Sequence, residues 1–181
     1  HLMMVMDMSA RLESPLPVRF ACLMHDLGKG TTPADVLPRH LGHELRSAKL
    51  LKGVCQRLRV PTECRELADV VAMEHGNIHR SGELNAAAVM RLIERCDGIR
   101  KPQGFEQVLL ACECDARGRG GLQEQPYPQR PRLLTALRAA QAVATADIAA
   151  LAASRGQTGP KVGEAIHKAR VHAVALDRTL P

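Results

Sequence analysis

Apolar residues recur at helical spacing along most of this chain, between turns that contain proline or glycine. In one segment they fall at Leu45, Ala48, Leu51, Cys55 and Leu58, three or four positions apart. Residues at this spacing share one face of an α-helix, which can be buried against another element. The pattern therefore predicts an all-α protein. We expect its helices over residues 1–12, 18–27, 43–58, 62–78, 85–99, 105–117, 132–143, 145–153 and 161–178.

The scarcity of aromatic residues also favours an all-α fold. The 181 residues include two Phe, one Tyr and no Trp, so the core must be built from Leu, Val, Ala, Met and Ile. That mixture favours helix over strand. A chain of this length suits one or two compact units that bury a core.

The cysteines and the hydropathy indicate a cytoplasmic protein. The six cysteines include no CxxC pair, and Cys112 and Cys114 would point about 200° apart on a helix, which argues against a shared metal. We expect buried, reduced thiols. No apolar run approaches the ~20 residues that cross a bilayer, and no signal-peptide pattern occurs, so no membrane partner is expected. The first residue is His1, which suggests a piece of a longer chain.

The net charge of +6 and the isoelectric point near 9.3 favour a polyanionic partner, although excess charge also keeps proteins in solution. With so few aromatic side chains, contacts with RNA would go to phosphates rather than to stacked bases. Scattered arginines are equally typical of a solvated surface. The candidate RNA-binding residues are Arg57, Arg59, Arg100, Lys101, Arg117, Arg119, Arg130 and Arg132.

The stretch FACLMHDLGKG ends a predicted helix with the pair His25 and Asp26 and then turns at glycines. Gly28 suits a left-handed cap on a helix that ends at Leu27. Two antiparallel helices joined by the proline-bounded turn ESPLP place residue n opposite residue 30 − n, because both rise equally per residue. This relation places His1 beside the His25–Asp26 pair.

A second predicted hairpin turns at about residue 60, with Thr62 as the expected N-cap of its second helix. The same geometry brings His43 opposite residue 77, close to His75. A third hairpin, through residues 85–120, carries Asp115 near the end of a helix. An acidic residue at such a place is normally solvated, so Asp115 joins the histidines only if this hairpin packs beside the other two.

Histidine nitrogens together with carboxylate oxygens suit divalent ions such as Mn, Fe, Ni, Zn or Co. Asp26 can bridge two ions, or bind one while orienting water. A metal ion here would activate water for attack on phosphorus, so phosphoester hydrolysis is the expected chemistry. Lys29 would contact a phosphate oxygen, or else complement the dipole of the preceding helix. The candidate metal ligands are His1, His25, Asp26, His43, His75 and Asp115, and the candidate catalytic residues are His25, Asp26 and Lys29.

Four further histidines are not among the candidate ligands. His79 lies one turn after His75 and could bind the metal, but a position that supports a ligand or faces solvent is favoured. His40 is spare. His167 and His172 belong to the C-terminal segment and are expected at the surface.

These residues carry a family resemblance. His1, HDLGKG at 25–30, GHE at 42–44, His75 and Asp115 resemble the H…HD…H…H…D pattern of the HD phosphohydrolase superfamily. Up to about residue 130, the chain also resembles the C-terminal part of bacterial multifunctional CCA proteins, which are tRNA nucleotidyltransferases with an appended HD domain. The stretches that carry this second resemblance are RFACLMHDLGKGTTP, LPRHLGHELRSAKLL, CQRLRVP and CDARGRGGLQEQPYPQ.

The resemblance implies an HD-domain bundle of antiparallel helix hairpins over residues 1–118, followed by a connector and a tRNA-facing helical arm over residues 119–181. It implies 2′,3′-cyclic phosphodiesterase, 2′-nucleotidase and phosphatase activity with a divalent cofactor such as nickel, manganese or magnesium. The Gly-rich loop and paired aspartates of a nucleotidyltransferase head do not occur here, so CCA addition is not expected of this chain. The expected partners are the tRNA 3′ end or small nucleotide phosphoesters, bound by a monomer or homodimer.

Two other interpretations stay open at this stage. In one, the chain is a non-catalytic helical body that binds tRNA, and its histidines are a weak or relic site. In the other, it is an HD hydrolase of free nucleotides, which would leave the stretch DARGRGG…YPQ unexplained. Metal-dependent hydrolysis that disappears on substitution of Asp26 would separate the first alternative from an enzyme.

Overall fold

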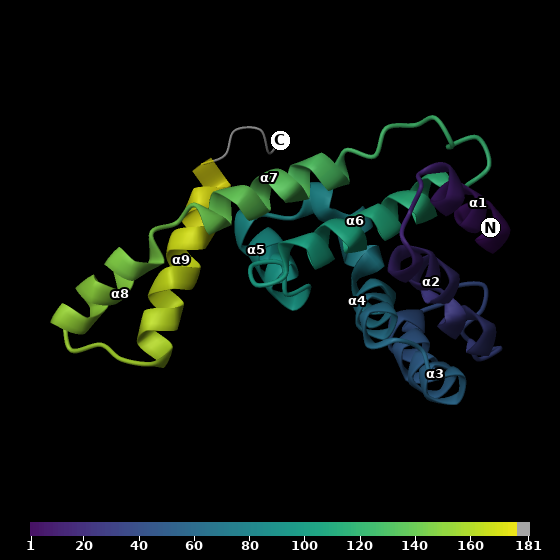
Figure 1. Cartoon of the computed structure of the whole chain (residues 1–181), viewed down its shortest axis with the longest axis horizontal. Helices are drawn as coiled ribbons and strands as arrows, with labels where there is room; N and C mark the ends of the chain where they lie inside the picture. Colours follow the sequence, from purple (N-terminus) through teal and green to yellow (C-terminus); the bar gives the residue numbers. More distant parts are fainter. Residues whose placement is uncertain (177–181) are drawn as a thin grey trace.

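The structure, a computed structural model, describes residues 1–176 of the chain (Figure 1). The all-α prediction is confirmed, since these residues form nine α-helices, two short 3-10 helices and no strand. The elements are α1 (Leu2–Arg11), α2 (Leu16–Met24), η1 (Leu27–Thr31), α3 (His43–Leu58), α4 (Thr62–His79), η2 (Ser81–Glu83), α5 (Ala86–Arg95), α6 (Pro102–Arg117), α7 (Gln129–Gln141), α8 (Thr145–Ser154) and α9 (Pro160–Leu176).

Helices α1, α2, α3, α4 and α6 form one bundle (Figure 1). The first two predicted hairpins, α1 with α2 and α3 with α4, are present, and α2 packs on α4 to join them. Helix α6 packs on α1, α2 and α4, and its Phe105 and Leu109 are fully buried. As a result Asp115, in the last turn of α6, lies inside the bundle with 3% of its surface exposed.

The remaining helices form a second layer and an arm. Helix α5 packs on α7 and α9 instead of forming the third hairpin with α6, because these helices cover its apolar face, which includes Val89 and Ile93. Helix α7 also packs on α6 and buries Leu133 and Leu137. Helices α8 and α9 pack on each other and project from the bundle (Figure 1). The last helix was predicted to reach Arg178, which lies outside the described residues.

Gly28 is not the left-handed cap predicted from the sequence. Helix α2 ends at Met24, and Gly28 lies within η1, which packs on α3. A β-carbon on Gly28 would stand 2.3 Å from the carbonyl oxygen of His43 and 2.5 Å from the amide nitrogen of Ser47. The glycine therefore permits the close approach of η1 to α3 that places Asp26 beside His43.

The prediction of Thr62 as the N-cap of α4 was also wrong. Pro61 holds the N-cap position in an extended conformation, with φ of −52° and ψ of 145°, and Thr62 is the first helical residue. Because the proline ring fixes φ near this value, the chain enters the helix directly after it. No side chain donates or accepts a capping hydrogen bond at this helix start.

The burial of the cysteine side chains, which the sequence predicted, is confirmed. All six cysteines are buried and unpaired. Within residues 1–176 no single helix is both long and apolar enough to span a membrane, and α7 and α8 reach that length and composition only as a pair bent by 43°.

Candidate metal centre

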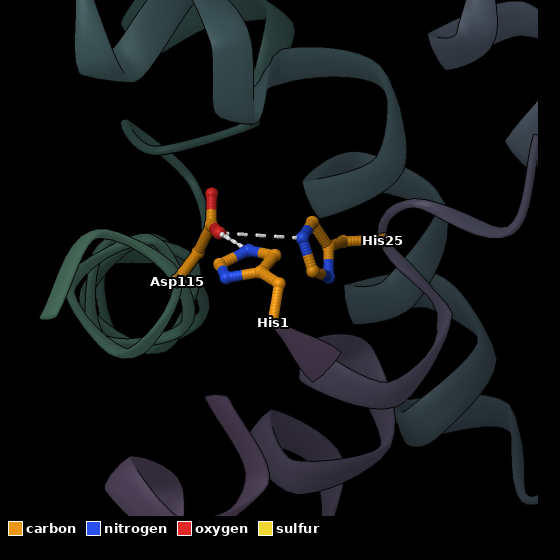
Figure 2. A group of neighbouring side chains, drawn as sticks. All are labelled: His1, His25 and Asp115. Carbon is orange, nitrogen blue, oxygen red and sulfur yellow. Dashed lines mark hydrogen bonds and ion pairs between the residues drawn. The ribbon is translucent and has the colours of Figure 1, made fainter. Parts of the chain in front are cut away.

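Three side chains from distant parts of the chain meet at the bundle, where His25 and Asp115 are buried and His1 is exposed (Figure 2). His1 precedes α1, His25 follows the last turn of α2, and Asp115 projects from the last turn of α6. The Oδ1 atom of Asp115 lies 2.7 Å from Nε2 of His1 and 3.4 Å from Nε2 of His25. One ligand atom from each residue lies within 4.8 Å of the other two, so a single cation can contact all three.

The contact between α1 and the end of α6 that assembles this group depends on Gly118. A β-carbon at this position would stand 2.6 Å from the α-carbon of Val5, so only glycine allows the two backbones to approach. The carbonyl oxygen of Gly118 accepts a hydrogen bond from Nδ1 of His1 at 3.2 Å. Gly118 thus both admits α1 and orients the imidazole that faces Asp115.

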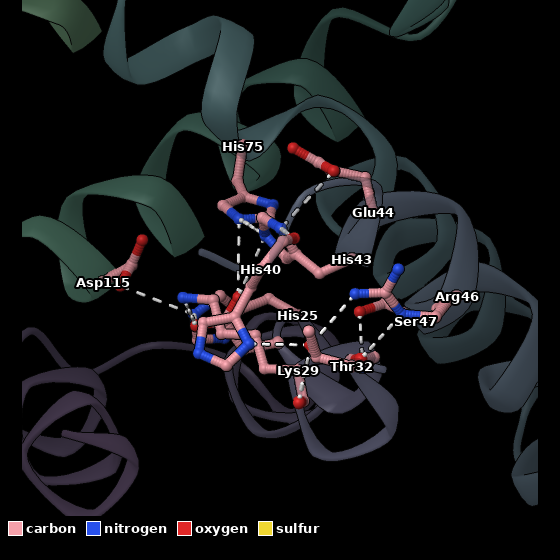
Figure 3. Close-up of polar contacts among 12 residues, drawn as sticks. His25, Lys29, Thr32, His40, His43, Glu44, Arg46, Ser47, His75 and Asp115 are labelled. Atoms are coloured by element: carbon pink, nitrogen blue, oxygen red, sulfur yellow. Dashed lines mark hydrogen bonds and ion pairs between the residues drawn. The ribbon is translucent and has the colours of Figure 1, made fainter. Parts of the chain in front are cut away.

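A second group consists of Asp26, His43 and His75. Figure 3 shows the two histidines of this group beside each other. Asp26 lies between α2 and η1, His43 is the first residue of α3, and His75 lies near the end of α4. The Oδ1 atom of Asp26 is 3.3 Å from Nε2 of His43 and 3.7 Å from Nε2 of His75. The two Nε2 atoms are 3.3 Å apart, and the three ligand atoms again lie within 4.8 Å of one another.

The consecutive residues His25 and Asp26 join the two groups. Nε2 of His25 lies 3.2 Å from Oδ2 of Asp26, and the His25 ring stands edge-on to the His75 ring at a centroid distance of 5.3 Å. The sequence predicted one set of six ligands. The structure brings all six residues together and divides them into two adjoining groups of three.

Four imidazoles in this site have the same orientation. Nδ1 of each ring donates a hydrogen bond to a backbone carbonyl oxygen: His1 to Gly118, His25 to Cys22, His43 to His40 and His75 to Val71, at 2.8 to 3.2 Å. A carbonyl oxygen can only accept, so Nδ1 must carry the hydrogen. In the neutral rings Nε2 therefore presents a lone pair toward the carboxylates. Histidines that bind metal ions typically have this arrangement.

Two buried atoms in the middle of the site make no hydrogen bond in the described structure. They are Nε2 of His25 and Oδ1 of Asp26. Buried polar atoms are nearly always hydrogen-bonded, and an unpaired one is costly. Because these atoms face the other ligand candidates and are a nitrogen and an oxygen donor, they fit a divalent transition-metal ion.

The charges in the site act on one another. Although burial alone would raise it, His25 and a neighbouring lysine hold the pKa of Asp26 well below its ordinary value. Burial opposes ionisation of Asp115 as well, yet His25 and His79 lower the pKa of Asp115. Burial disfavours a charge on His25, but the two carboxylates raise its pKa to about 10. Burial and the charge of His25 lower the pKa of His75. Two ionised carboxylates and a neutral His75 are thus available at neutral pH.

Each carboxylate uses its second oxygen for a different contact. Oδ2 of Asp26 accepts a hydrogen bond from Nζ of Lys29 at 2.6 Å. Oδ2 of Asp115 accepts one from Nε2 of His79 at 2.6 Å. His79 therefore supports a candidate ligand, which is one of the three roles that the sequence left open for it.

Two adjoining cavities lead to the site. One has a volume of about 340 Å³ and is lined by His1, His25, Asp26, Lys29 and three leucines. The other, of about 480 Å³, is also lined by His1 and Lys29 and adds Arg119. Two basic side chains, Lys29 and Arg119, therefore line these cavities together with the ligand candidates His1, His25 and Asp26.

Sequence reasoning missed several residues that hold the site together. Arg46 donates hydrogen bonds to the carbonyl oxygen of Gly28 and to Thr32, and the hydroxyl of Ser47 accepts one from the amide of Gly28 (Figure 3). Thr32 in turn contacts Nδ1 of His40. These contacts fix η1 against α3. A polar residue one turn after His43 was the available signal, but many exposed helix positions look the same.

The remaining histidines lie away from the site. Nδ1 of His167, on α9, donates to Glu94 on α5 at 2.8 Å, so this half-buried residue joins the arm to the second layer. His172 is exposed, as expected.

The eight candidate RNA contacts lie in different environments. Arg57 and Arg59 are exposed at the end of α3, and no carboxylate within the described part of the chain approaches them to 4.0 Å. Arg119 lines the cavity at the metal centre, and Arg132 is half-buried on α7. Five already form ion pairs with carboxylates: Arg100 with Asp97, Lys101 with Glu66, Arg119 with Asp115 at 4.0 Å, and Arg117 and Arg130 with Glu113.

Comparison with known proteins gives one family. The model of the HD domain matches residues 1–135, which include both groups of ligand candidates. Relatives called Multifunctional CCA protein are similar over nearly the whole chain: the one from Polaromonas naphthalenivorans is 74% identical over 96% of it, that from Acidovorax sp. 71% over 97%, and that from Leptothrix cholodnii 58% over 98%. The chain spans 41 to 42% of the length of these relatives. No solved structure matches the chain.

Proposed function

Because this chain belongs to the HD domain family, we propose that it hydrolyses phosphoesters with divalent cations bound at its two groups of histidine and carboxylate ligands. The family is one of metal-dependent phosphohydrolases. The assignment of the site rests on the common orientation of four imidazoles. In each, Nδ1 donates to a backbone carbonyl oxygen and Nε2 is turned inward. This orientation directs the Nε2 atoms inward before any cation arrives, and His25, whose pKa is raised to about 10, must release its proton from Nε2 when a cation binds.

The side chains of the chain have separate tasks in this proposal. A bound cation supplies Lewis acidity and activates water for attack on phosphorus. The two carboxylates hold the cations and are themselves kept ionised by neighbouring positive charge. Lys29 lies at the mouth with 38% of its side chain exposed, so its ammonium can contact a phosphate oxygen while it stays near Asp26.

The proposed substrates are 2′,3′-cyclic phosphodiesters, 2′-nucleotides and phosphomonoesters. The relatives are called CCA proteins, which supports the tRNA 3′ end as the setting, in maturation and repair. The exposed and unpaired Arg57 and Arg59 are the proposed contacts with the tRNA backbone.

Hydrolysis of 2′,3′-cyclic AMP and p-nitrophenyl phosphate, with and without added nickel or manganese, tests the enzyme. Wild-type activity should require the metal. Asp26→Asn should lower the rate of hydrolysis by more than about 100-fold. Loss of a residue that only supports a ligand typically costs ten- to hundredfold, and loss of the ligand itself should cost more. The matched control is Asp7→Asn, which makes the same change at an exposed position of α1.

Two results would contradict the proposal. Hydrolysis that persists in chelator, or that Asp26→Asn leaves unchanged, would place the chemistry elsewhere. An absence of hydrolysis in every metal, with tRNA binding intact, would favour a non-catalytic tRNA-binding body.

A further inference from the structure

The two oxygens of Asp115 have different partners. Oδ1 faces the ligand atoms of His1 and His25, at 2.7 and 3.4 Å. Oδ2 faces away from them and lies 2.6 Å from Nε2 of His79. The orientation of the carboxylate, and so the position of its ligand oxygen, is therefore set in part by His79.

His79 is held in turn by the connector between α6 and α7. Its Nδ1 lies 2.8 Å from the hydroxyl of Tyr127, and the two rings stand nearly perpendicular at a centroid distance of 5.8 Å. The amide of Gln129 donates to the carbonyl oxygen of His79 at 3.1 Å. Tyr127 is the one tyrosine of the chain, and its side chain is directed into the bundle rather than into solvent.

The direction of these hydrogen bonds follows from the chemistry of the groups. Burial, together with the negative charge of Asp115 and Glu113, raises the pKa of Tyr127 far above its ordinary value, so the phenol keeps its proton. An ionised carboxylate can only accept, so Nε2 of His79 must donate to Asp115. Because the phenol keeps its proton, the Tyr127 hydroxyl donates a hydrogen bond to Nδ1 of His79. The bonds run from Tyr127 to His79 to Asp115.

A hydrogen bond fixes the connector, and an ion pair fixes the start of α7, to the helix that carries Asp115. Arg130 lies 2.8 Å from Glu113, and Arg117 donates to the carbonyl oxygen of Gln123. Glu113 and Arg117 flank Asp115 at a distance of two residues on α6. These contacts hold the segment that carries Tyr127 in place beside Asp115. They do not depend on the hydrogen bonds to His79.

We propose that His79 and Tyr127 are positioning residues that orient Asp115 for cation binding, with Tyr127 acting through His79. The inference rests on the proposed function, because it takes Asp115 as a ligand. It adds that the connector, which the sequence suggested was a separate segment, contributes to the metal centre.

Calorimetric titration of the metal-free 181-residue chain with Mn²⁺ tests the order of action. His79→Phe keeps a ring but removes both hydrogen bonds, and should weaken Mn²⁺ binding by about 10- to 100-fold. Tyr127→Phe removes only the hydroxyl and should weaken it by about two- to tenfold. If Tyr127 acts through His79, the double variant should bind as His79→Phe does. Thr135→Val, which removes a hydroxyl from neighbouring α7, should bind as wild type.

A second measurement needs no metal. The ¹⁵N shifts of the His79 ring at pH 8 should report a hydrogen on Nε2 and none on Nδ1, and Tyr127→Phe should move the Nδ1 resonance. A purely structural role would lower the melting temperature of the variant without changing this signature.

The outcomes separate the inference from the function on which it rests. A wild type that binds Mn²⁺, together with a Tyr127→Phe variant unchanged in both measurements, would overturn the inference alone. Additive effects in the double variant would overturn the claim that Tyr127 acts through His79. A wild type with the expected His79 signature but no Mn²⁺ binding would overturn the proposed function and, with it, the role in cation binding.

Discussion

The Nε2 atoms of His43 and His75 face each other across 3.3 Å, while Nδ1 of each ring donates to a backbone carbonyl oxygen. Two lone pairs at this distance cannot form a hydrogen bond when both rings are neutral and protonated at Nδ1. The carboxylate of Asp26 faces the same point. A cation between these three atoms would convert a mutually unfavourable contact into coordination bonds.

Divalent metal should therefore stabilise the fold. At a free Mn²⁺ concentration of 100 times Kd, one site contributes about 2.7 kcal/mol. For a chain of this length that is a rise of about 5 to 10 °C in melting temperature. Thermal unfolding with Mn²⁺ and with chelator measures the difference. Asp26→Asn should abolish most of the rise and Asp7→Asn should keep it, so an equal rise in both variants would count against the site.

The metal-free protein should lose stability as the pH rises from about 6.5 to about 10. The pKa of His25 rises from its ordinary value of 6.5 to about 10 in the folded protein. The folded state therefore binds the imidazole proton more tightly than the unfolded state does. The contribution is complete below pH 6.5 and is lost as the pH approaches 10. Urea unfolding in chelator, at intervals across this window, should show the decline. His25→Asn should flatten it, and a wild-type free energy of unfolding that stays constant would contradict the assignment.

The lowered pKa values of Asp26 and Asp115 act in the opposite direction. Their ionised forms stabilise the fold above their ordinary pKa of 3.8, and this contribution is lost as the pH falls below that value. Together these three groups should contribute most to the stability of the metal-free chain between about pH 4 and 6.5.

Two neighbouring glycines offer a matched test of the packing of η1 on α3. Gly28→Ala would drive a methyl group into the backbone of His43 and Ser47 and should cost about 3 kcal/mol or more. Gly30→Ala meets no atom within 4 Å and should change stability by less than about 1 kcal/mol. Chemical denaturation of both variants in chelator measures the difference. Equal destabilisation would mean that the close approach is not required.

The pairing of the histidines could be predicted from the sequence because it depends on local geometry. Two helices that share a short turn rise equally per residue, so counting from the turn places His1 near His25 and His43 near His75. The turns at ESPLP and RVPTE are marked by proline, which made the count reliable. The same reasoning gave helix boundaries within a few residues.

The rest depends on contacts that no local pattern encodes. The role of Gly28 follows from the distance between η1 and α3, since a glycine after a helix is more often a cap. Tyr127 reaches His79 across 48 residues and through a segment without regular structure. The division of the six ligand candidates into two groups follows from which carboxylate oxygen faces which ring, and side-chain rotation sets that choice.

Lys29 should affect both metal and substrate. Lys29→Met removes the hydrogen bond that orients Asp26 and leaves the cavity mouth with less positive charge. We expect Mn²⁺ binding to weaken by about tenfold and KM for 2′,3′-cyclic AMP to rise at saturating metal. Lys29→Arg keeps the charge and should restore most of the wild-type KM. A KM that stays at the wild-type value in Lys29→Met would assign this lysine to Asp26 alone.

Exposed, unpaired arginines should contribute more to tRNA binding than those already paired with carboxylates. Arg57 and Arg59 have no carboxylate within 4.0 Å in the described residues, whereas Arg100 makes two hydrogen bonds to Asp97. A paired guanidinium must give up its carboxylate before it can bind a phosphate, so its net contribution is small. Arg57→Gln with Arg59→Gln should weaken tRNA binding and lower the slope of log K against log salt by about 1 for each phosphate group that the variant no longer neutralises. Filter binding at several salt concentrations measures both quantities. Arg100→Gln makes the same change at a paired site and should leave the slope unaltered; an equal reduction there would show that net charge, and not the position at the end of α3, governs the interaction.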